Sequence, residues 1–367
     1  MSESLLSTII PQMQSFDTYA SASPANQDIL AAAVTSDTSP TSGDTISISE
    51  AARQQAASDQ AAKQPTDVAA TGATSPGTAQ PQATAVLVGM AETQSGRQVS
   101  IEKYSLTTAA TDGSGAGVTL SGLMVTVGAT DKQAQQRYLL TGDTMLSEDK
   151  NGALQVSSYT AGQETSGNDI IIGVSGATLA GGGGDDTIYD FSRTGAESIL
   201  GGDGNDTIVV AGNTIGTTID AGSGDDAVVV AGNIIASKVS LGDGNDTLLT
   251  TDIGVASQTT IDTGDGNDII SASYIGIGGG QVNITTGGGN DTIDASYIGL
   301  GESQVNIDTG DGNDLVHSSW IGLGIGGNGQ VNITTGNGND KVDASWIGVG
   351  IRGGKSQVNI DTGDGND

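Results

Sequence analysis

Short runs of β-prone apolar residues set residues 82–160 apart from the segment before them. The runs ATAVLVG, QVSIEKYSL, GVTLSGLMVTV and ALQVSSY are broken by TDGSGAG and by the polar stretch DKQAQQR. Apolar stretches of this length, bounded by Gly-rich or polar breaks, are typical of β-strands. The pattern predicts a small β-rich unit over 82–160, which contains no motif that we connect to chemistry.

From residue 161 the pattern becomes periodic, and a nine-residue motif recurs at steps of 20, 20, 20, 22, 23, 23, 26 and 27 residues. Copies such as GGDGNDTIV (201–209) share Gly at the second and fourth positions, Asp at the sixth and a large apolar residue at the eighth, and a degenerate first copy, SGNDIII, occupies 166–172. A period this regular indicates stacked turns. Over 161–367 we therefore predict an all-β fold, a parallel β-roll or β-helix solenoid. The sixth-position residues are Asp186, Asp206, Asp226, Asp246, Asp268, Asp291, Asp314, Asp340 and Asp367.

Over residues 181–367 the motif resembles the RTX nonapeptide repeat of secreted bacterial proteins, Gly-Gly-x-Gly-x-Asp-x-(large apolar)-x. The resemblance implies a β-roll in which a Gly-rich loop presents main-chain carbonyls to Ca²⁺ and the Asp supplies carboxylate oxygen, each ion lying between loops of successive turns. Gly allows the φ > 0 conformations that turn carbonyls to one side, and Ca²⁺ accepts roughly six to eight oxygens in loose geometry. Besides the nine Asp residues, the candidate metal-site residues are Gly182, Gly184, Gly202, Gly204, Gly222, Gly224, Gly242, Gly244, Gly264, Gly266, Gly287, Gly289, Gly310, Gly312, Gly336 and Gly338.

A column of aspartates without compensating charge would be unfavourable. Neighbouring strands of a sheet lie about 4.8 Å apart, and like charges at that distance repel by roughly 1 kcal/mol even in water. A simple turn sequence explains one GDGND copy but not nine copies with a constant Asp, so we expect cations in the column. Because each turn holds one motif, Ca²⁺ is expected along one edge only, with about eight ions between the nine loops.

The remainder of each later turn predicts a second strand and a different corner. In QVNIT (281–285) and its equivalents, Val and Ile alternate with Asn, so an apolar face points inward and an Asn ladder faces outward. The corners between the two strands, such as YIGIGGG and WIGVGIRGG, lack an aligned Asp and become longer toward the C-terminus. We expect variable loops there, which would make any contact with a surface glycan or another protein. The expected ladder consists of Asn283, Asn306, Asn332 and Asn359.

Four aromatic residues, Tyr274, Tyr297, Trp320 and Trp346, each follow the aligned Asp by six residues. The apolar motif residue follows that Asp by two, and the even difference of four puts the aromatic side chains on the same inward side if the strand continues that far. We therefore favour an aromatic stack in the core over an exposed platform for sugar rings. His317 is next to the inward apolar motif residue, so the same alternation places it on the outward side, and it is predicted to be a solvated surface residue.

Residues 1–81 have a different composition, dominated by Ala, Ser, Thr, Gln and Asp, and they contain all six prolines. Such a segment buries too little apolar surface to offset its ordering entropy, so we predict disorder. A short helix is expected near 48–63, because Ser47 and Glu50 form a capping box ahead of AARQQAASDQAAK. It has no apolar face, and we interpret it as part of a linker.

Charge and composition restrict the partners and the chemistry. The net charge is −31, of which −23 lies in residues 161–367, and this disfavours nucleic acid and anionic membrane surfaces. Cys is absent and His occurs once, so a disulfide framework, a thiol nucleophile or a zinc site of the usual ligands cannot form. A bound metal must therefore have oxygen ligands. No apolar run approaches the roughly 18 residues of a membrane span.

Three classes of function are compatible with these features. We favour a noncatalytic calcium-dependent module of a secreted or cell-surface protein, of the adhesin or matrix type. The resemblance implies export by a type I apparatus, which agrees with the lack of a Sec signal peptide at the N-terminus, and folding outside the cell, where calcium is abundant.

The second class is a larger type I-secreted hydrolase or toxin. Catalysis within these residues is not expected, because no His-Glu-x-x-His or Gly-x-Ser-x-Gly motif occurs. The last copy stops at Asp367, before its apolar residue, so we interpret the array as truncated and leave a catalytic region beyond it open. The third class, an ice-binding roll, is disfavoured by charged Asp at the third motif position.

Overall fold

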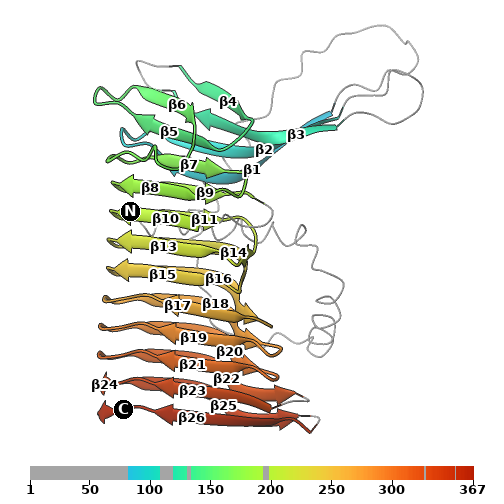
Figure 1. Ribbon diagram of the computed structural model, residues 1–367, viewed down its shortest axis with the longest axis vertical. Coiled ribbons are helices and arrows are strands. Elements are labelled where there is room, and N and C mark those ends of the chain that lie inside the picture. The colour runs from blue at the N-terminus through green and yellow to red at the C-terminus, as the bar shows by residue number, and fades with distance from the viewer. Residues whose placement is uncertain (1–81, 108–118, 130–133, 193–197, 326–327, 352) are drawn as a thin grey trace, which may run out of the picture.

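A computed structural model describes residues 82–107, 119–129, 134–192, 198–325, 328–351 and 353–367. In these ranges the protein is all-β and contains no helix (Figure 1). Accordingly, the described part of the chain has no helix with the length and apolar character needed to cross a membrane. The disorder predicted for 1–81 and the helix predicted near 48–63 lie outside the described residues.

From residue 170 onward the chain winds into a parallel β-solenoid of about eight turns, which confirms the predicted fold class. Figure 1 shows the turns stacked like rungs, each turn contributing one strand to each of two facing sheets. The nine-stranded sheet consists, in spatial order, of β26 (Lys355–Asp361), β23 (Asn328–Thr334), β21 (Gln304–Asp308), β19 (Gln281–Thr285), β17 (Gln258–Asp262), β15 (Lys238–Asp243), β13 (Thr218–Ser223), β10 (Ser198–Asp203) and β8 (Leu179–Gly183).

The second, twelve-stranded sheet continues past the solenoid at its N-terminal end, where β5 and β6 pair antiparallel. It consists of β25 (Lys341–Ile351), β22 (Leu315–Ile325), β20 (Thr292–Leu300), β18 (Ile269–Ile277), β16 (Thr247–Val255), β14 (Ala227–Ile235), β11 (Thr207–Val210), β9 (Thr187–Asp190), β7 (Ile170–Gly173), β5 (Thr144–Glu148) and β6 (Leu154–Ser158), with β12 (Thr214–Ile215) beside β14.

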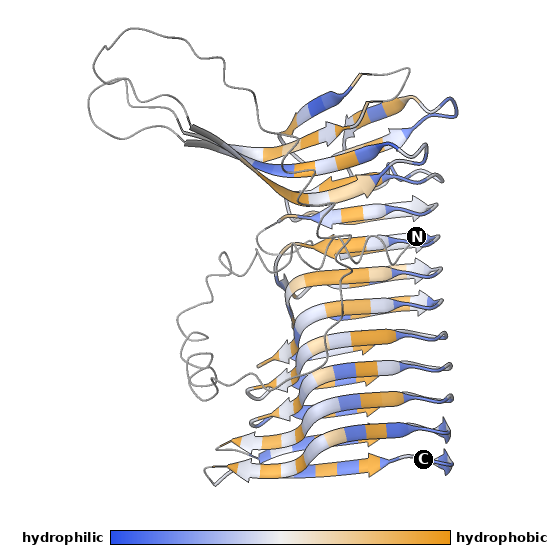
Figure 2. Cartoon of the chain, turned by 180° about the vertical axis from the view of Figure 1, so that it is seen from behind, coloured by the Kyte–Doolittle hydropathy of each residue, from blue (hydrophilic) through white to orange (hydrophobic). Residues whose placement is uncertain are grey.

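Parallel, in-register pairing places equal motif positions side by side and builds one continuous core between the two sheets. The eighth-position residues are fully buried from Ile188 to Val316, and from the nine-stranded sheet Val282 and Ile284 face them, as the alternation predicted. The apolar bands therefore align from turn to turn in Figure 2. The Asn ladder is also confirmed. Its amides bond from turn to turn, from Asn306 Nδ2 to Asn283 Oδ1 (2.9 Å), from Asn332 to Asn306 (2.7 Å) and from Asn359 to Asn332 (2.7 Å).

The lengthening of the later turns has a different structural outcome from the variable loops that we expected. The extra residues extend the facing strands, so that β20 has nine residues and β22 eleven, while β21 has five and β23 seven. Extra residues in a parallel stack gain ladder hydrogen bonds when they extend a strand. The corner therefore grows as a wider sheet.

The predicted β-rich unit over 82–160 is divided between two sheets: β5 and β6 join the twelve-stranded sheet, while residues 82–140 form a separate antiparallel sheet that packs on the outside of the first turns. Its strands are β1 (Gln82–Glu92), β2 (Gln98–Thr107), β3 (Thr119–Val127) and β4 (Gln136–Leu140), in that spatial order. Val99 and Ile101 of β2 and Val125 of β3 are fully buried in a core that is separate from the one inside the solenoid.

The ninth motif position determines how far this outer sheet extends along the solenoid. In the first four turns the position holds Tyr189, Val209, Val229 and Leu249. These side chains belong to the core beneath the outer sheet β1–β4 or pack against it. Ser271 takes the position in the next turn, and polar residues follow in the later turns. At one end of the contact the Met90 N–H donates to Tyr189 Oη (3.1 Å), whose hydroxyl donates to the Met90 carbonyl. The outer sheet therefore covers the turns whose ninth residue is apolar.

This contact predicts that Val229→Asn will destabilise the outer sheet. A buried amide without partners costs about 1–3 kcal/mol in addition to the lost apolar contact, so we expect the free energy of unfolding to fall by roughly 2–4 kcal/mol. Chemical denaturation measures this change, and limited proteolysis of β1–β4 shows where it acts. The control is Ser271→Asn, the same position beyond the outer sheet, with an expected change of at most about 0.5 kcal/mol. Equal effects of the two substitutions would contradict the contact.

Candidate metal-binding edge

The predicted Asp and Gly residues lie together along one edge of the solenoid, where the loop of each motif joins the nine-stranded sheet to the twelve-stranded sheet. In Figure 1 this edge carries the short strand β24 (Asn337–Gly338), which pairs with β27 (Asp364–Gly365). The motif determines the corner locally, since the strand before it ends near the third position and the next begins at the seventh, as between β10 and β11. Equal positions of all loops are therefore in contact with their counterparts one turn away.

The aspartates form a hydrogen-bonded ladder along this edge. The backbone N–H of each Asp donates to Oδ1 of the Asp one turn further along: Asp186 to Asp206 (2.8 Å), Asp206 to Asp226 (2.7 Å) and Asp226 to Asp246 (2.7 Å). The series continues to Asp340, whose N–H donates to Asp367 (3.0 Å).

Asp169, from the degenerate first copy, belongs to the same ladder, although the sequence analysis did not include it among the site residues. Its N–H donates to Asp186 Oδ1 (2.7 Å), and its side chain is buried. The signal for it was present in SGNDIII, which retains the Asn-Asp pair followed by apolar residues.

The second oxygen of these carboxylates is buried and, in most turns, has no hydrogen-bond partner. From Asp186 to Asp340 the aligned residues are at most 3% exposed. An isolated carboxylate in such a place is strongly disfavoured as an anion. The Oδ2 atoms without a partner are those of Asp186, Asp206, Asp226, Asp246, Asp268, Asp314 and Asp340.

Burial accordingly raises the pKa of these carboxyl groups. The pKa of Asp186 and Asp226 rises to about 8, mainly because these residues are buried. The hydrogen bond that each carboxylate accepts from a backbone N–H lowers the pKa, and the neighbouring carboxylates raise it further. The pKa of Asp206 and Asp246 rises to about 7 for the same leading reason. Ionisation of the column, as the pH rises through these values, therefore destabilises the folded state unless cations compensate the charge.

The glycines have the backbone geometry that the motif predicted. At the second position φ runs from +119° at Gly202 to +70° at Gly363, and at the fourth from +104° at Gly184 to +159° at Gly312, while Gly338 does not share the positive φ. A Cβ on Gly204 would lie 2.3 Å from the carbonyl oxygen of Gly184, one turn away. Carbonyl oxygens of the second and fourth positions therefore project toward the next loop, where only glycine leaves room for them.

The fifth motif position forms a second ladder that the sequence analysis did not identify. Its side-chain oxygen accepts the N–H of the same position one turn further along, for example from Asp225 to Asn205 Oδ1 (2.7 Å) and from Asn267 to Asn245 Oδ1 (3.0 Å). The position holds only Asn or Asp in every copy, and this restriction was the available signal. These side chains are exposed, so the ladder orders the outer rim of the loops.

Within the described residues, no three acidic or imidazole side chains converge at one point. Each gap between turns offers the carboxylates of two successive Asp residues together with carbonyl oxygens of the Gly loops. A hard cation with loose geometry fits such a donor set, because Ca²⁺ accepts mixtures of carbonyl and carboxylate oxygen. A cation bound in these gaps would compensate the negative charge at the unpartnered Oδ2 atoms.

The prediction that the aromatic ladder lies in the core is wrong. Tyr274, Tyr297 and Trp320 are half-buried, Trp346 is 56% exposed, and the Ile that follows each of the first three fills the core instead. The rings stack nearly parallel, with centroids 4.9, 6.4 and 5.3 Å apart. Each strand bends just before the aromatic residue, so the alternation of sides does not continue across it.

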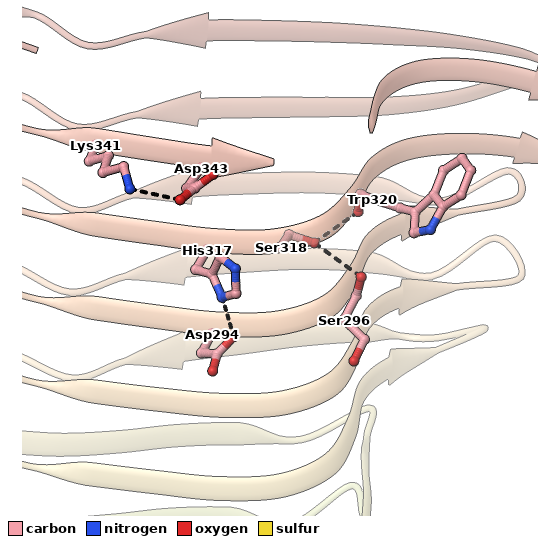
Figure 3. A network of polar contacts seen from close by, with 7 residues as sticks. All are labelled: Asp294, Ser296, His317, Ser318, Trp320, Lys341 and Asp343. Atoms are coloured by element: carbon pink, nitrogen blue, oxygen red, sulfur yellow. Dashed lines mark hydrogen bonds and ion pairs between the residues drawn. The ribbon is translucent and has the colours of Figure 1, made fainter. Parts of the chain in front are cut away.

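The buried hydroxyl of Ser318 shows how this bend is held. Its oxygen lies 2.9 Å from the carbonyl of Trp320 and 3.3 Å from that of Ser296, and either carbonyl can accept its one proton, as Figure 3 shows at the bend of β22. Asp252 occupies the aromatic position one turn before Tyr274 and is buried, and this burial raises its pKa to about 6. In the described turns on either side the same position holds Asn233 and Tyr274, so Asp252 does not continue into a second carboxylate column there.

His317 is exposed on the outer face of β22, as predicted. Its Nδ1 lies 3.0 Å from Asp294 Oδ1 in the neighbouring strand, and Lys341 pairs with Asp343 at 2.7 Å close by (Figure 3). Exposed pairs of this kind contribute little to stability.

Comparison of the chain with models of protein families, with curated proteins and with solved structures finds no match.

Proposed function

We propose that this chain is a noncatalytic, calcium-dependent solenoid module of a secreted or cell-surface protein, of the adhesin or matrix type. The column of buried aspartates with unpaired second oxygens carries the proposal. Protonation also relieves the column, but this relief is lost as the pH rises through the raised pKa values of about 7 to 8. A divalent cation compensates the carboxylates when they are ionised, and so relieves the column above this pH range as well.

The chemistry of the donor set supports calcium as the cation. Oxygen is the only ligand type available on the edge, and each gap combines two carboxylates with main-chain carbonyls. Mg²⁺ prefers a stricter octahedron and retains several waters, which suits a closely packed stack of loops less well. Since calcium is abundant outside cells and scarce inside them, calcium-dependent folding supports an extracellular location.

The inner rings of the aromatic ladder do not add a sugar-binding platform to this function. Its rings face one another at stacking distance, so each inner ring has both faces covered by neighbours and presents only an edge to solvent. Stacking of a sugar needs a free ring face. Contacts with a glycan or a protein would therefore use other parts of the surface, and the polar outer face of the nine-stranded sheet offers the Asn ladder.

Asp268→Asn tests the proposed calcium site. Asp268 Oδ1 accepts the Asp246 N–H at 2.8 Å. An Asn side chain retains an oxygen for this hydrogen bond, but the substitution removes the negative charge that a cation requires. We expect the calcium stoichiometry of the full chain, measured by calorimetry or native mass spectrometry, to fall from about eight by one or two ions. The control is Asp262→Asn, on the outer face of β17, which should leave the stoichiometry unchanged. A wild-type count near sixteen, or of one or two, would contradict the single-edge site.

A further inference from the structure

Asp252, in β16, is a buried carboxylate that does not belong to the aspartate column. It is 7% exposed, and its Oδ1 is buried without a hydrogen-bond partner among the described residues. None of the ion pairs found in the described part of the chain includes it. Burial raises the pKa of this carboxyl to about 6. Above that pH it is a buried anion whose charge no described group compensates.

The ring of Tyr274 lies one turn further along, at the same strand position as Asp252. One face of this ring stacks on Tyr297, with centroids 4.9 Å apart and planes inclined by 10°. The opposite face is therefore directed toward the turn of Asp252. The pKa of the Tyr274 hydroxyl rises mainly through burial, and the charge of Asp252 raises it further, which agrees with this proximity. The face of an aromatic ring is electronegative, so it disfavours an ionised carboxylate and attracts a cation.

The turn before Asp252 contributes neutral oxygen atoms to the same place. Asn233 of β14 pairs with Asp252, and directly before this pair two residues of β14 oppose one of β16. Irregularities of this kind re-aim groups of the strand. Here the carbonyl of Gly232 accepts a hydrogen bond from the buried Thr250 hydroxyl over 3.0 Å. Amide, carbonyl and hydroxyl oxygens therefore lie at the strand positions next to the carboxylate.

We propose that Asp252, the free face of Tyr274 and the oxygens of the Asn233 turn form a site for one monovalent alkali cation. One carboxylate with neutral neighbours balances a single positive charge, whereas a divalent ion would leave an excess charge buried. A cation between the carboxylate and the ring is attracted by both. The site lies at another strand position from the aspartate column, so it goes beyond the proposed calcium function and does not depend on it.

Thermal unfolding of the full chain in saturating calcium, at about pH 8 where the carboxyl is ionised, tests this site. The probe is potassium chloride, and the reference is the chloride of N-methyl-D-glucamine, an organic cation too large for a buried site, at equal ionic strength. We expect potassium to raise the midpoint of the wild-type chain by about 3–6 °C, the range for one site at roughly ten times its dissociation constant.

Variants of the two residues locate the effect. Asp252→Asn should fold, because Asn213 and Asn233 occupy the same position in the two preceding turns, and its midpoint should differ by less than about 1 °C between the salts. Asp262→Asn, the same change at an exposed position of β17, is the control and should keep the wild-type shift. Tyr274→Phe retains the ring face and should keep the shift, whereas Tyr274→Leu should lower it by about half.

Equal midpoints of the wild-type chain in the two salts, or a shift that persists in Asp252→Asn, would show that no monovalent cation binds here. A full shift in Tyr274→Leu would contradict the role of the ring. A calcium count that falls by one in Asp252→Asn would assign the site to a divalent ion and overturn the proposal. None of these results bears on the aspartate column, which Asp268→Asn tests, so the failures of the two proposals are distinguishable.

Discussion

Saturating calcium is expected to raise the unfolding midpoint of the intact chain by tens of degrees relative to the chelated protein. A ligand at about 100 times its dissociation constant stabilises the native state by about 2.7 kcal/mol per site, so about eight sites would supply on the order of 20 kcal/mol. A domain of this size shifts its midpoint by roughly 2–4 °C per kcal/mol. Far-UV circular dichroism during heating measures the shift.

Magnesium at the same concentration is the control for this experiment. Both ions screen the net charge of −31 equally, but Mg²⁺ fits the loop oxygens less well, so its effect should be much smaller. Equal stabilisation by the two ions would show that screening, and not a built site, holds the column together.

Gly242→Ala is the single substitution from which we expect the largest loss of stability. A Cβ at this residue would lie 1.6 Å from the Gly222 carbonyl oxygen, and the residue has φ +113°. The alanine must therefore displace a neighbouring loop in addition to adopting a conformation that L-residues avoid. Denaturation with calcium present should show a loss of about 3–5 kcal/mol, and the calcium count should fall at the gaps next to this loop.

Gly212→Ala is the matched control, since a Cβ there has no atom within 4 Å and the residue has no positive φ. The change in its free energy of unfolding should stay within about 1 kcal/mol. If Gly242→Ala lowered the free energy of unfolding no more than Gly212→Ala, the close contact between successive loops at Gly242 would be contradicted.

Much of the solenoid could be predicted because its information is local and repeated. Nine copies with a constant Asp specify parallel, in-register stacking, and alternation in QVNIT specifies which residues face inward. Val282 and Ile284 are buried, and Asn283 and Asn306 bond as expected. The column of aspartates follows from the same spacing, because equal positions of successive turns must lie side by side.

The aromatic ladder shows where such reasoning fails. Parity counting assumes an unbroken strand, but the chain bends at Ser318, whose hydroxyl lies within hydrogen-bonding distance of two carbonyls at the bend. One irregular residue reverses every later side chain. Ile321 therefore takes the core position that we had assigned to Trp320.

The sequence by itself determined the repeat, the direction of stacking, the apolar core and the placement of Asp and Gly on one edge, because each depends on periodicity within the chain. Only the tertiary structure decided which turns the outer sheet covers, which carboxylate oxygens lack a partner and which have a threonine hydroxyl. These features arise from contacts between residues distant in sequence, such as Met90 with Tyr189, or between neighbouring atoms of a folded loop, such as Thr286 Oγ1 with Asp291 Oδ2. No spacing along the chain encodes those distances, because they exist only after the turns have packed.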